Sequence, residues 1–223
     1  GWKFYAERDW LAGVFYWTGF DYRGEPNPMV FPATSSEFGI LDYCGFPKDE
    51  AFYLKSWWTK EPVLHILPHW NLDGHDGEKI SVWVYSNCEE VQLIVNGKKL
   101  ERKKTPLNGH LEWDATYRPG YVKAVGYRNG RKVMETRIET AGKPVKEVWT
   151  YDIVGDIMVA EVEMRDDKGR FVPTANCDLE FTVPEAGWKI LGWGNGDPAF
   201  QHIERPFTTG AAASYPAGTP VPD

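Results

Sequence analysis

Apolar and polar side chains alternate with a period of two along much of residues 62–139, which is the pattern of strands buried on one face. The runs are EKISVWVYS, EVQLIVNGKKL, GHLEWDATY and GYVKAVGYRNGRKVMETRIE, and Asn-Gly turn signals mark residues 96–97, 108–109 and 129–130. About seven strands in about eighty residues indicates a β-sandwich of immunoglobulin type. We predict this sandwich over residues 61–142, with the runs around Val91 and Val122 on its inner faces.

Residues 1–60 show a mixed helix and strand pattern instead. One helix is expected over Trp2 to Trp10, and a second should begin after Pro47 and end near Trp58. The continuous apolar run AGVFYW at residues 12–17 is typical of a strand buried on both faces, as a parallel barrel supplies. The proline-rich segment 24–34 is expected to be a loop.

A second series of strands follows the proline-containing joint at residues 141–147. Its runs are EVWTYDIV, DIMVAEVEMRD, CDLEFTVPE and WKILGWGNG, with a hairpin turn expected at residues 166–173 around Gly169. They predict a second immunoglobulin-like sandwich over residues 143–205, which we expect to be incomplete because its last strand is missing. Residues 206–223 are rich in small residues and proline, so they predict a flexible tail.

Charge and hydropathy limit the partners. The formal net charge is −7, with acids interleaved among the bases, so no nucleic-acid partner is expected. No run of eighteen apolar residues occurs, which argues against a membrane partner. The first residues lack the basic-then-apolar order of a signal peptide, and a periplasmic or secreted location stays open. Whether the chain forms an oligomer also stays open.

The residue types that bind metals do not form a recognisable motif. Three widely spaced cysteines indicate neither a disulfide framework nor a zinc site. His65, His69 and His75 are expected in surface or turn roles, since Pro68 interrupts any helix that would align the first two. In GWGNGDP, Asn195 and Asp197 could cap a turn or hold calcium, and the turn is favoured. We expect no metal and no cofactor.

Aromatic residues are abundant, with eleven each of Trp, Tyr and Phe. Large rings either pack a β core or stack on flat ligands such as sugars. Most are expected to pack, and Trp83, Trp113 and Trp149 are assigned to the sandwich cores or to contacts between domains.

Two blocks in the first sixty residues resemble glycoside hydrolase family 2, and β-galactosidases in particular. LAGVFYWTGFDYRGEP at residues 11–26 resembles the eighth barrel strand and its loop, and SSEFGILDYCGFPKDEAFYLKSWW at residues 35–58 resembles the closing loop and last helix. VQLIVNGKKL, GRFVPTANCDLEFTV and GWGNGDP are similar to the modules that follow the barrel. The resemblance thus implies a mainly β chain: residues 1–60 end a (β/α)8 barrel, and two immunoglobulin-like β-sandwiches follow.

The resemblance implies a retaining enzyme that hydrolyses terminal β-galactosides, with a carbohydrate as its partner. Its two catalytic glutamates lie on the fourth and seventh barrel strands, which would precede Gly1, so this chain alone is expected to be inactive. Within the family, β-glucuronidase and β-mannosidase are alternatives. Outside it, the alternative is a carbohydrate-binding or adhesion protein of tandem immunoglobulin-like domains.

Seven residues are candidates for contact with the sugar. Trp17 ends the apolar run and would stack on the sugar at the mouth of the barrel. Polar groups next to it either bond sugar hydroxyls or pair with one another, and Glu37 as a catalytic acid is disfavoured because no second carboxylate lies near it in the sequence. The candidates are Trp17, Asp21, Tyr22, Arg23, Glu25, Glu37 and Phe38.

Overall fold

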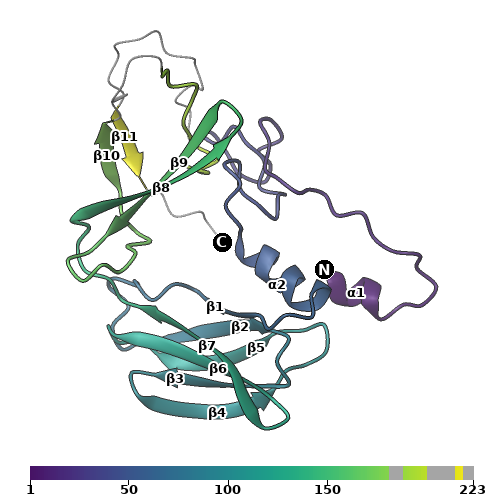
Figure 1. Cartoon of the computed structure of the whole chain (residues 1–223). Coiled ribbons are helices and arrows are strands. Elements are labelled where there is room, and N and C mark those ends of the chain that lie inside the picture. Colours follow the sequence, from purple (N-terminus) through teal and green to yellow (C-terminus); the bar gives the residue numbers. More distant parts are fainter. Residues whose placement is uncertain (181–187, 200–213, 218–223) are drawn as a thin grey trace. The chain divides into compact units, whose positions relative to one another are not determined.

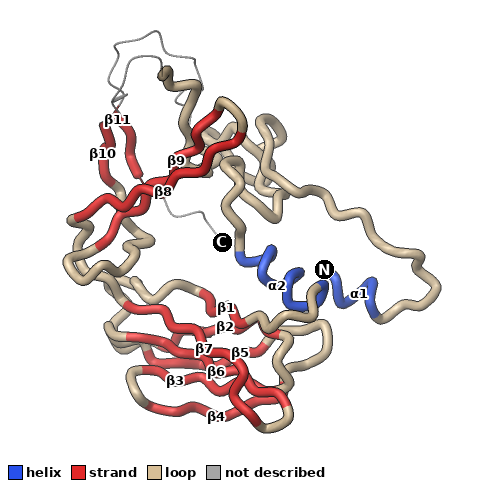
Figure 2. Tube along the Cα trace, in the orientation of Figure 1, coloured by secondary structure: helices blue, strands red, loops and turns tan. Residues whose placement is uncertain are grey.

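The computed structural model describes residues 1–180, 188–199 and 214–217, and the strands dominate these residues (Figures 1 and 2). The chain divides into two compact units. The first unit comprises residues 1–17 and 47–140, and the second comprises residues 18–46 and 141–223. The expectation of a mainly β chain is confirmed. No helix in the described part of the chain is long and apolar enough to cross a membrane.

The first unit contains the predicted sandwich, built from seven antiparallel strands. One sheet has the order β1-β2-β5, and the other has the order β4-β3-β6-β7. The strands are β1 (Leu64–Leu67), β2 (Lys79–Ser86), β3 (Glu90–Val95), β4 (Lys98–Lys104), β5 (Leu111–Thr116), β6 (Tyr121–Arg128) and β7 (Arg131–Glu139).

Burial in the sandwich follows the alternation of the sequence. In β5 every second residue is buried, and Val91 and Val122 are fully buried on the two central strands of the larger sheet, as predicted. The turns β3–β4 and β6–β7 use Asn96-Gly97 and Asn129-Gly130, whose residues all have positive φ, as tight hairpins of this type require. The local turn chemistry therefore fixes the register that the core needs.

The two helices belong to the same unit and differ in how well they match expectation. Helix α2 (Asp49–Trp58) has the predicted extent, and its Phe52 ring stacks on His65 of β1 at 3.9 Å between ring centres. Helix α1 (Trp2–Ala6) ends well before Trp10. It stops because the Arg8 guanidinium donates to the Phe4 carbonyl (2.7 Å) and the backbone turns through Leu11, whose N–H bonds Arg8.

Three aromatic donors fasten these helices to the loop between β4 and β5. The Trp2 indole donates to the Asn108 side chain (3.1 Å), and the Tyr53 hydroxyl donates to the Asn108 carbonyl (2.7 Å). The Trp57 indole donates to the Gly109 carbonyl (3.3 Å). Loop carbonyls that would otherwise need water are satisfied by the helices.

The strand predicted at residues 12–17 is wrong for this chain. No helix or strand lies between Glu7 and Lys48, and Figure 2 shows this stretch as a loop. The Phe15 and Trp17 side chains are exposed, with relative accessibilities of 104% and 73%. A doubly buried strand needs a ladder partner on each side, and the described residues give this run neither. A barrel remnant is therefore not seen.

The second unit contains two antiparallel pairs in its described residues. Strands β8 (Lys146–Val154) and β9 (Ile157–Arg165) form one hairpin, and β10 (Cys177–Glu180) pairs with β11 (Ser214–Ala217). The apolar side chains Ile153, Val154 and Ile157 at the hairpin tip are exposed. Apart from β11, the tail predicted at residues 206–223 lies outside the described residues.

The predicted turn around Gly169 is organised by the buried Asp166 carboxylate. It accepts the backbone N–H groups of Lys168 (2.9 Å), Arg170 (2.8 Å) and Gly142 (2.8 Å), and it pairs with the Arg170 guanidinium (2.6 Å). Burial alone would raise the pKa of Asp166, but these donors outweigh it and hold that pKa far below its usual range. The carboxylate thus ties Gly142, at the start of the segment 141–223, to this turn.

We predict that Leu93→Ala destabilises the first unit by about 2–5 kcal/mol, because it removes a side chain fully buried between the sheets and leaves a cavity. The control is Leu107→Ala in the β4–β5 loop, where Leu107 is 76% exposed and the change should stay within about 0.5 kcal/mol. Urea unfolding followed by tryptophan fluorescence measures both. Equal losses for the two variants would contradict the sandwich core.

Candidate functional site

Six of the seven candidate residues lie in the segment 18–46, which folds back on itself. Its two halves are joined by backbone hydrogen bonds from Asp21 N–H to the Leu41 carbonyl (3.0 Å) and from Ile40 N–H to the Thr18 carbonyl (3.0 Å). Further along, Ser36 N–H donates to the Tyr22 carbonyl (2.8 Å). The segment therefore has a defined backbone although it contains no regular strand.

Asp21 holds the two halves together from the inside. Its side chain is buried, and one carboxylate oxygen accepts the Gly39 N–H at 2.8 Å. Gly39 has no room for a side chain, since a Cβ there would lie 2.3 Å from the Asp21 nitrogen and 2.3 Å from the Leu41 oxygen. The role that the structure gives this oxygen of Asp21 is therefore to position the backbone.

Asp42 is a second buried carboxylate in this segment, and the sequence analysis missed it. One oxygen accepts the N–H groups of Cys44 and Phe46, both at 2.8 Å. Burial raises the pKa of Asp42 against these hydrogen bonds, and the nearby Asp21 charge adds to the rise. The spacing Asp-x-x-Gly in DYCG, which suits a turn anchored by an aspartate, was the available signal.

The GWGNGDP loop of the same unit packs its backbone against this Asp42 turn. A Cβ on Gly196 would meet the Asp42 carboxylate at 2.0 Å, and one on Gly194 would meet the Cys44 sulfur at 2.6 Å. Asn195 and Asp197 each accept the backbone N–H two residues ahead, at 2.9 and 2.8 Å. The predicted turn is thus confirmed, and its glycines allow the close approach.

The remaining polar candidates sit on the outside of segment 18–46. The Tyr22 hydroxyl donates to the Glu25 carboxylate. The Arg23 guanidinium donates to the Thr34 hydroxyl (3.1 Å) and the Ser35 hydroxyl (3.3 Å), and it lies 4.7 Å from the centre of the Tyr43 ring. These contacts restrict how the phenol, carboxylate and guanidinium can point, which is what a binding surface needs.

The aromatic candidates occupy different places. The centre of the Phe38 ring lies 6.4 Å from that of Tyr22, and Glu37 is partly buried. Trp17 belongs to the first unit, where its indole is largely exposed. The structure thus brings together Asp21, Tyr22, Arg23, Glu25, Glu37 and Phe38 in one folded segment, and contact of these residues and of Trp17 with a sugar stays a prediction.

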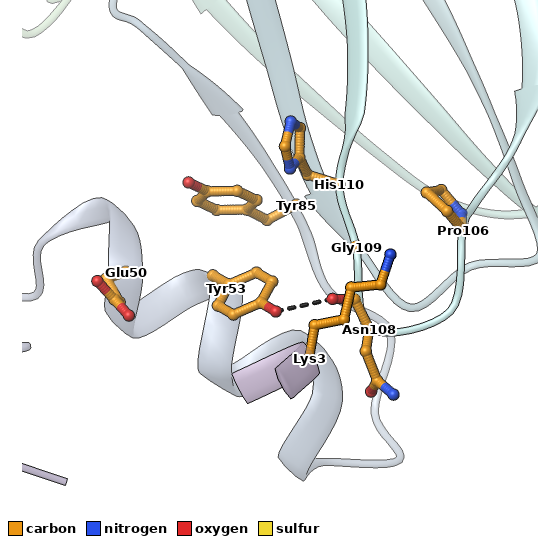
Figure 3. Close-up of a pocket in the computed structure, with 8 residues that line it drawn as sticks. All are labelled: Lys3, Glu50, Tyr53, Tyr85, Pro106, Asn108, Gly109 and His110. Carbon is orange, nitrogen blue, oxygen red and sulfur yellow. Dashed lines mark hydrogen bonds between the residues drawn. The ribbon is translucent and has the colours of Figure 1, made fainter. Parts of the chain in front are cut away.

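A pocket of about 420 Å³ opens in the first unit, where α1 and α2 meet the smaller sheet (Figure 3). Tyr53 of α2 and Tyr85 of β2 supply rings to its wall, with ring centres 5.4 Å apart. Burial raises the pKa of both phenols, that of Tyr85 to about 12 with help from the carboxylates of Asp49 and Glu50. No sequence motif marks this pocket, because its residues come from four separate parts of the chain.

In the described part of the chain, no three His, Cys, Asp or Glu side chains gather as a metal site would need. His65 bonds Asp49 (2.5 Å), and His75 bonds Glu78 (2.8 Å), so both imidazoles serve local contacts.

Trp113 is a core residue as expected, whereas Trp83 lies on the outer face of the smaller sheet and stacks on His110 at 4.1 Å.

We predict that Gly39→Ala disrupts segment 18–46 and lowers stability by about 1–3 kcal/mol, since the new methyl group collides with backbone atoms that cannot swing away. Gly19→Ala is the matched control, because a Cβ on Gly19 meets nothing within 4 Å. Limited proteolysis with mapping of the cleavage sites measures the effect. Faster cleavage within 18–46 is expected for Gly39→Ala alone, and equal cleavage of both variants would contradict the fold of the segment.

The sequence comparisons point to glycosidases. Residues 77–134 match a family model described as a domain of unknown function, DUF4982. The chain is 42% identical to "Beta-galactosidase BoGH2A" of Bacteroides ovatus over 88% of its own length and 24% of that protein. It is 34% identical to a "Putative beta-glucuronidase" of Formosa agariphila over 88% of the chain and 20% of that protein. The chain thus spans between a fifth and a quarter of these curated relatives.

Solved structures with a similar fold lead to the same family. A β-glycosidase from Bacteroides vulgatus superposes with a TM-score of 0.85 at 29% identity, over 97% of this chain and 28% of that one. A glycosyl hydrolase family 2 member from Bacteroides cellulosilyticus gives a TM-score of 0.82 at 27% identity, over 97% and 34%. The resemblance inferred from the sequence blocks is confirmed. The chain belongs to glycoside hydrolase family 2.

Proposed function

We propose that the whole protein is a retaining β-glycosidase that removes terminal β-galactosides from oligosaccharides or glycans. The observation that carries the proposal is the 42% identity to a β-galactosidase over 88% of this chain. The sequence GFDYRGEP at residues 19–26, which lies in the block that resembles β-galactosidases, supports the same substrate. The curated relatives and structural neighbours named above are glycosidases, which disfavours an adhesion protein.

The catalytic carboxylates would lie upstream of this chain in the whole protein. A retaining site needs two carboxyl groups about 5 Å apart on either side of the glycosidic bond, supplied by different strands of a complete barrel. Residues 1–60 would close that barrel, residues 61–142 and 143–205 would form two sandwich modules, and residues 206–223 a tail. The exposed Phe15 and Trp17 rings support this division, because packing against barrel strands would remove their apolar surface from water.

In this proposal, segment 18–46 contributes part of the wall that receives the sugar. Tyr22, Arg23, Glu25, Glu37 and Phe38 are its candidate contacts with the sugar, and the buried Asp21 supports them from within. For Trp17 of the first unit, stacking on the apolar face of the ring is a separate proposal. The Asp21 and Asp42 carboxylates support this role indirectly, since they hold the backbone from which the outer side chains project. A wall that is fixed before the substrate arrives loses less entropy on binding.

A β-glucuronidase is the second candidate, because a putative enzyme of that name is 34% identical to the chain. A glucuronide carries a carboxylate at C6 where a galactoside has a hydroxymethyl group, and its C4 hydroxyl has the opposite orientation. The carboxylate needs a cation to receive it. Arg23 is the cation of the candidate wall, and its hydroxyl and ring contacts hold the guanidinium in one place. A β-glucuronidase would therefore need the charge of Arg23 to bind its substrate, whereas a β-galactosidase would not.

We expect the whole protein to hydrolyse a β-galactoside chromogen at least about 10-fold more efficiently than the β-glucuronide, a difference of about 1.4 kcal/mol in transition-state binding. The present chain alone should release no chromophore, because the proposal places both catalytic carboxylates outside it. Initial rates at pH 7 with both chromogens measure this. A preference for the glucuronide would favour the second candidate, and turnover by the chain alone would refute the placement of the catalytic groups upstream.

A second expectation concerns Trp17 in the same whole protein. Trp17→Ala should raise KM for the galactoside by about 10-fold or more, because an indole face packed on the sugar is lost. Trp10→Ala is the matched control, since Trp10 is equally exposed, at 77%, and lies outside the candidate wall. Identical kinetics of the two variants would remove Trp17 from the site.

A further inference from the structure

The pocket of the first unit is built from parts that hold one another in place. The β4–β5 loop forms one wall through Pro106, Asn108 and Gly109, and the three aromatic donors of α1 and α2 fix this loop. Opposite it, the Tyr85 ring contacts Tyr53 edge to face (5.4 Å) and His110 edge to face (6.3 Å). The walls are therefore arranged before any ligand arrives, which is the usual condition of a small-molecule site.

The lining combines ring surfaces with hydrogen-bonding groups of both kinds. Figure 3 shows the rings of Tyr53, Tyr85 and His110 around the space, with Glu50 at one side and Lys3 at the other. The carboxylate accepts hydrogen bonds, the ammonium donates them, and the Tyr85 hydroxyl can do both. A ligand for such a pocket must be apolar on one face and rich in hydroxyl groups on its edge.

The charged side chains around the pocket further limit the class of ligand that it can bind. One carboxylate and one ammonium line the pocket, and Asp49 and Glu7 lie close enough to act on its two phenols. An anionic ligand would be repelled by this excess of acids, and a purely apolar one would strip water from the Glu50 carboxylate and the Lys3 ammonium, whose partners in the chain are Tyr16 and Glu7 (3.9 Å). A neutral sugar ring meets neither penalty.

A further aromatic surface continues from the pocket along β2. The side chains of Ser81, Trp83 and Tyr85 alternate with the buried residues of this strand and share the outer face of the sheet. The Trp83 indole stacks on His110, which itself lines the pocket, and donates to the Ser81 hydroxyl (2.9 Å). A saccharide longer than one ring would find a second flat surface beside the first.

We propose that this pocket binds a neutral pyranose ring of a saccharide, with Tyr53 and Tyr85 as its apolar wall and Glu50, Asn108 and Lys3 as its hydrogen-bonding groups. The Trp83 and His110 pair receives the next ring of the same saccharide. The site stands on the lining of the first unit and does not rest on the proposed reaction. A failure of the hydrolysis assay would leave it untouched.

Titration of the ¹⁵N-labelled full chain with methyl β-galactopyranoside, methyl β-glucopyranoside and methyl β-glucuronide tests the site. Amide signals of Asn108, Gly109 and His110 should shift saturably with either neutral sugar, with a Kd of about 1–10 mM, and at least about threefold more weakly with the glucuronide. The proposal is overturned if these amides do not move in the folded chain up to about 100 mM of both neutral sugars, or if the glucuronide binds best.

Two variants and a control assign the effect to the lining. Glu50→Gln keeps the shape of the side chain and should weaken binding by about 10-fold, as should Tyr85→Leu, which removes the ring. Glu101→Gln changes an exposed carboxylate on β4 and should leave Kd unchanged. Unchanged binding in both folded lining variants, or equal weakening in the control, would refute the assignment.

Discussion

Burial of apolar side chains between two sheets is the constraint on which the first unit depends. Val82, Val84, Leu93 and Val122 lose contact with water only if each strand keeps its register, because a shift by one residue would turn every one of them outward. The side chains on the outer faces of the sheets can then make other contacts. On the smaller sheet they receive α2 through the stack of Phe52 on His65, and they carry the rings of the pocket.

Two buried aspartates organise turns in the second unit, and their pKa values move in opposite directions for a simple reason. Asp42 and Asp166 both accept several backbone N–H groups, but Asp166 also faces the Arg170 guanidinium, whereas Asp42 has the like charge of Asp21 nearby. For Asp166 the backbone N–H of Gly142 and the Arg170 guanidinium together outweigh the cost of burial, whereas for Asp42 burial outweighs the backbone donors. The same kind of turn therefore contains a carboxyl group with a lowered pKa in one case and one with a raised pKa in the other.

The sequence predicted what depends on local pattern and missed what depends on distant partners. Strand alternation, the Asn96-Gly97 turn and helix α2 are each encoded within a few residues, so they were foreseen. The run at 12–17 failed because a doubly buried strand is defined by its neighbours, which its own residues cannot supply. The pocket was missed for the same reason, since Lys3, Tyr53, Tyr85 and Asn108 meet only after folding. Segment 18–46 was located by resemblance, and its internal Asp21 anchor emerged from the structure.

The β8–β9 hairpin has a practical consequence for handling the chain. Its tip presents exposed β-branched residues on a ribbon that has two strands among the described residues, a combination that promotes intermolecular sheet formation at high concentration. Asp152 and Asp156 lie beside the apolar residues and act as charged gatekeepers, and their effect weakens as salt screens them. Low ionic strength is therefore the condition in which the isolated chain should remain dispersed.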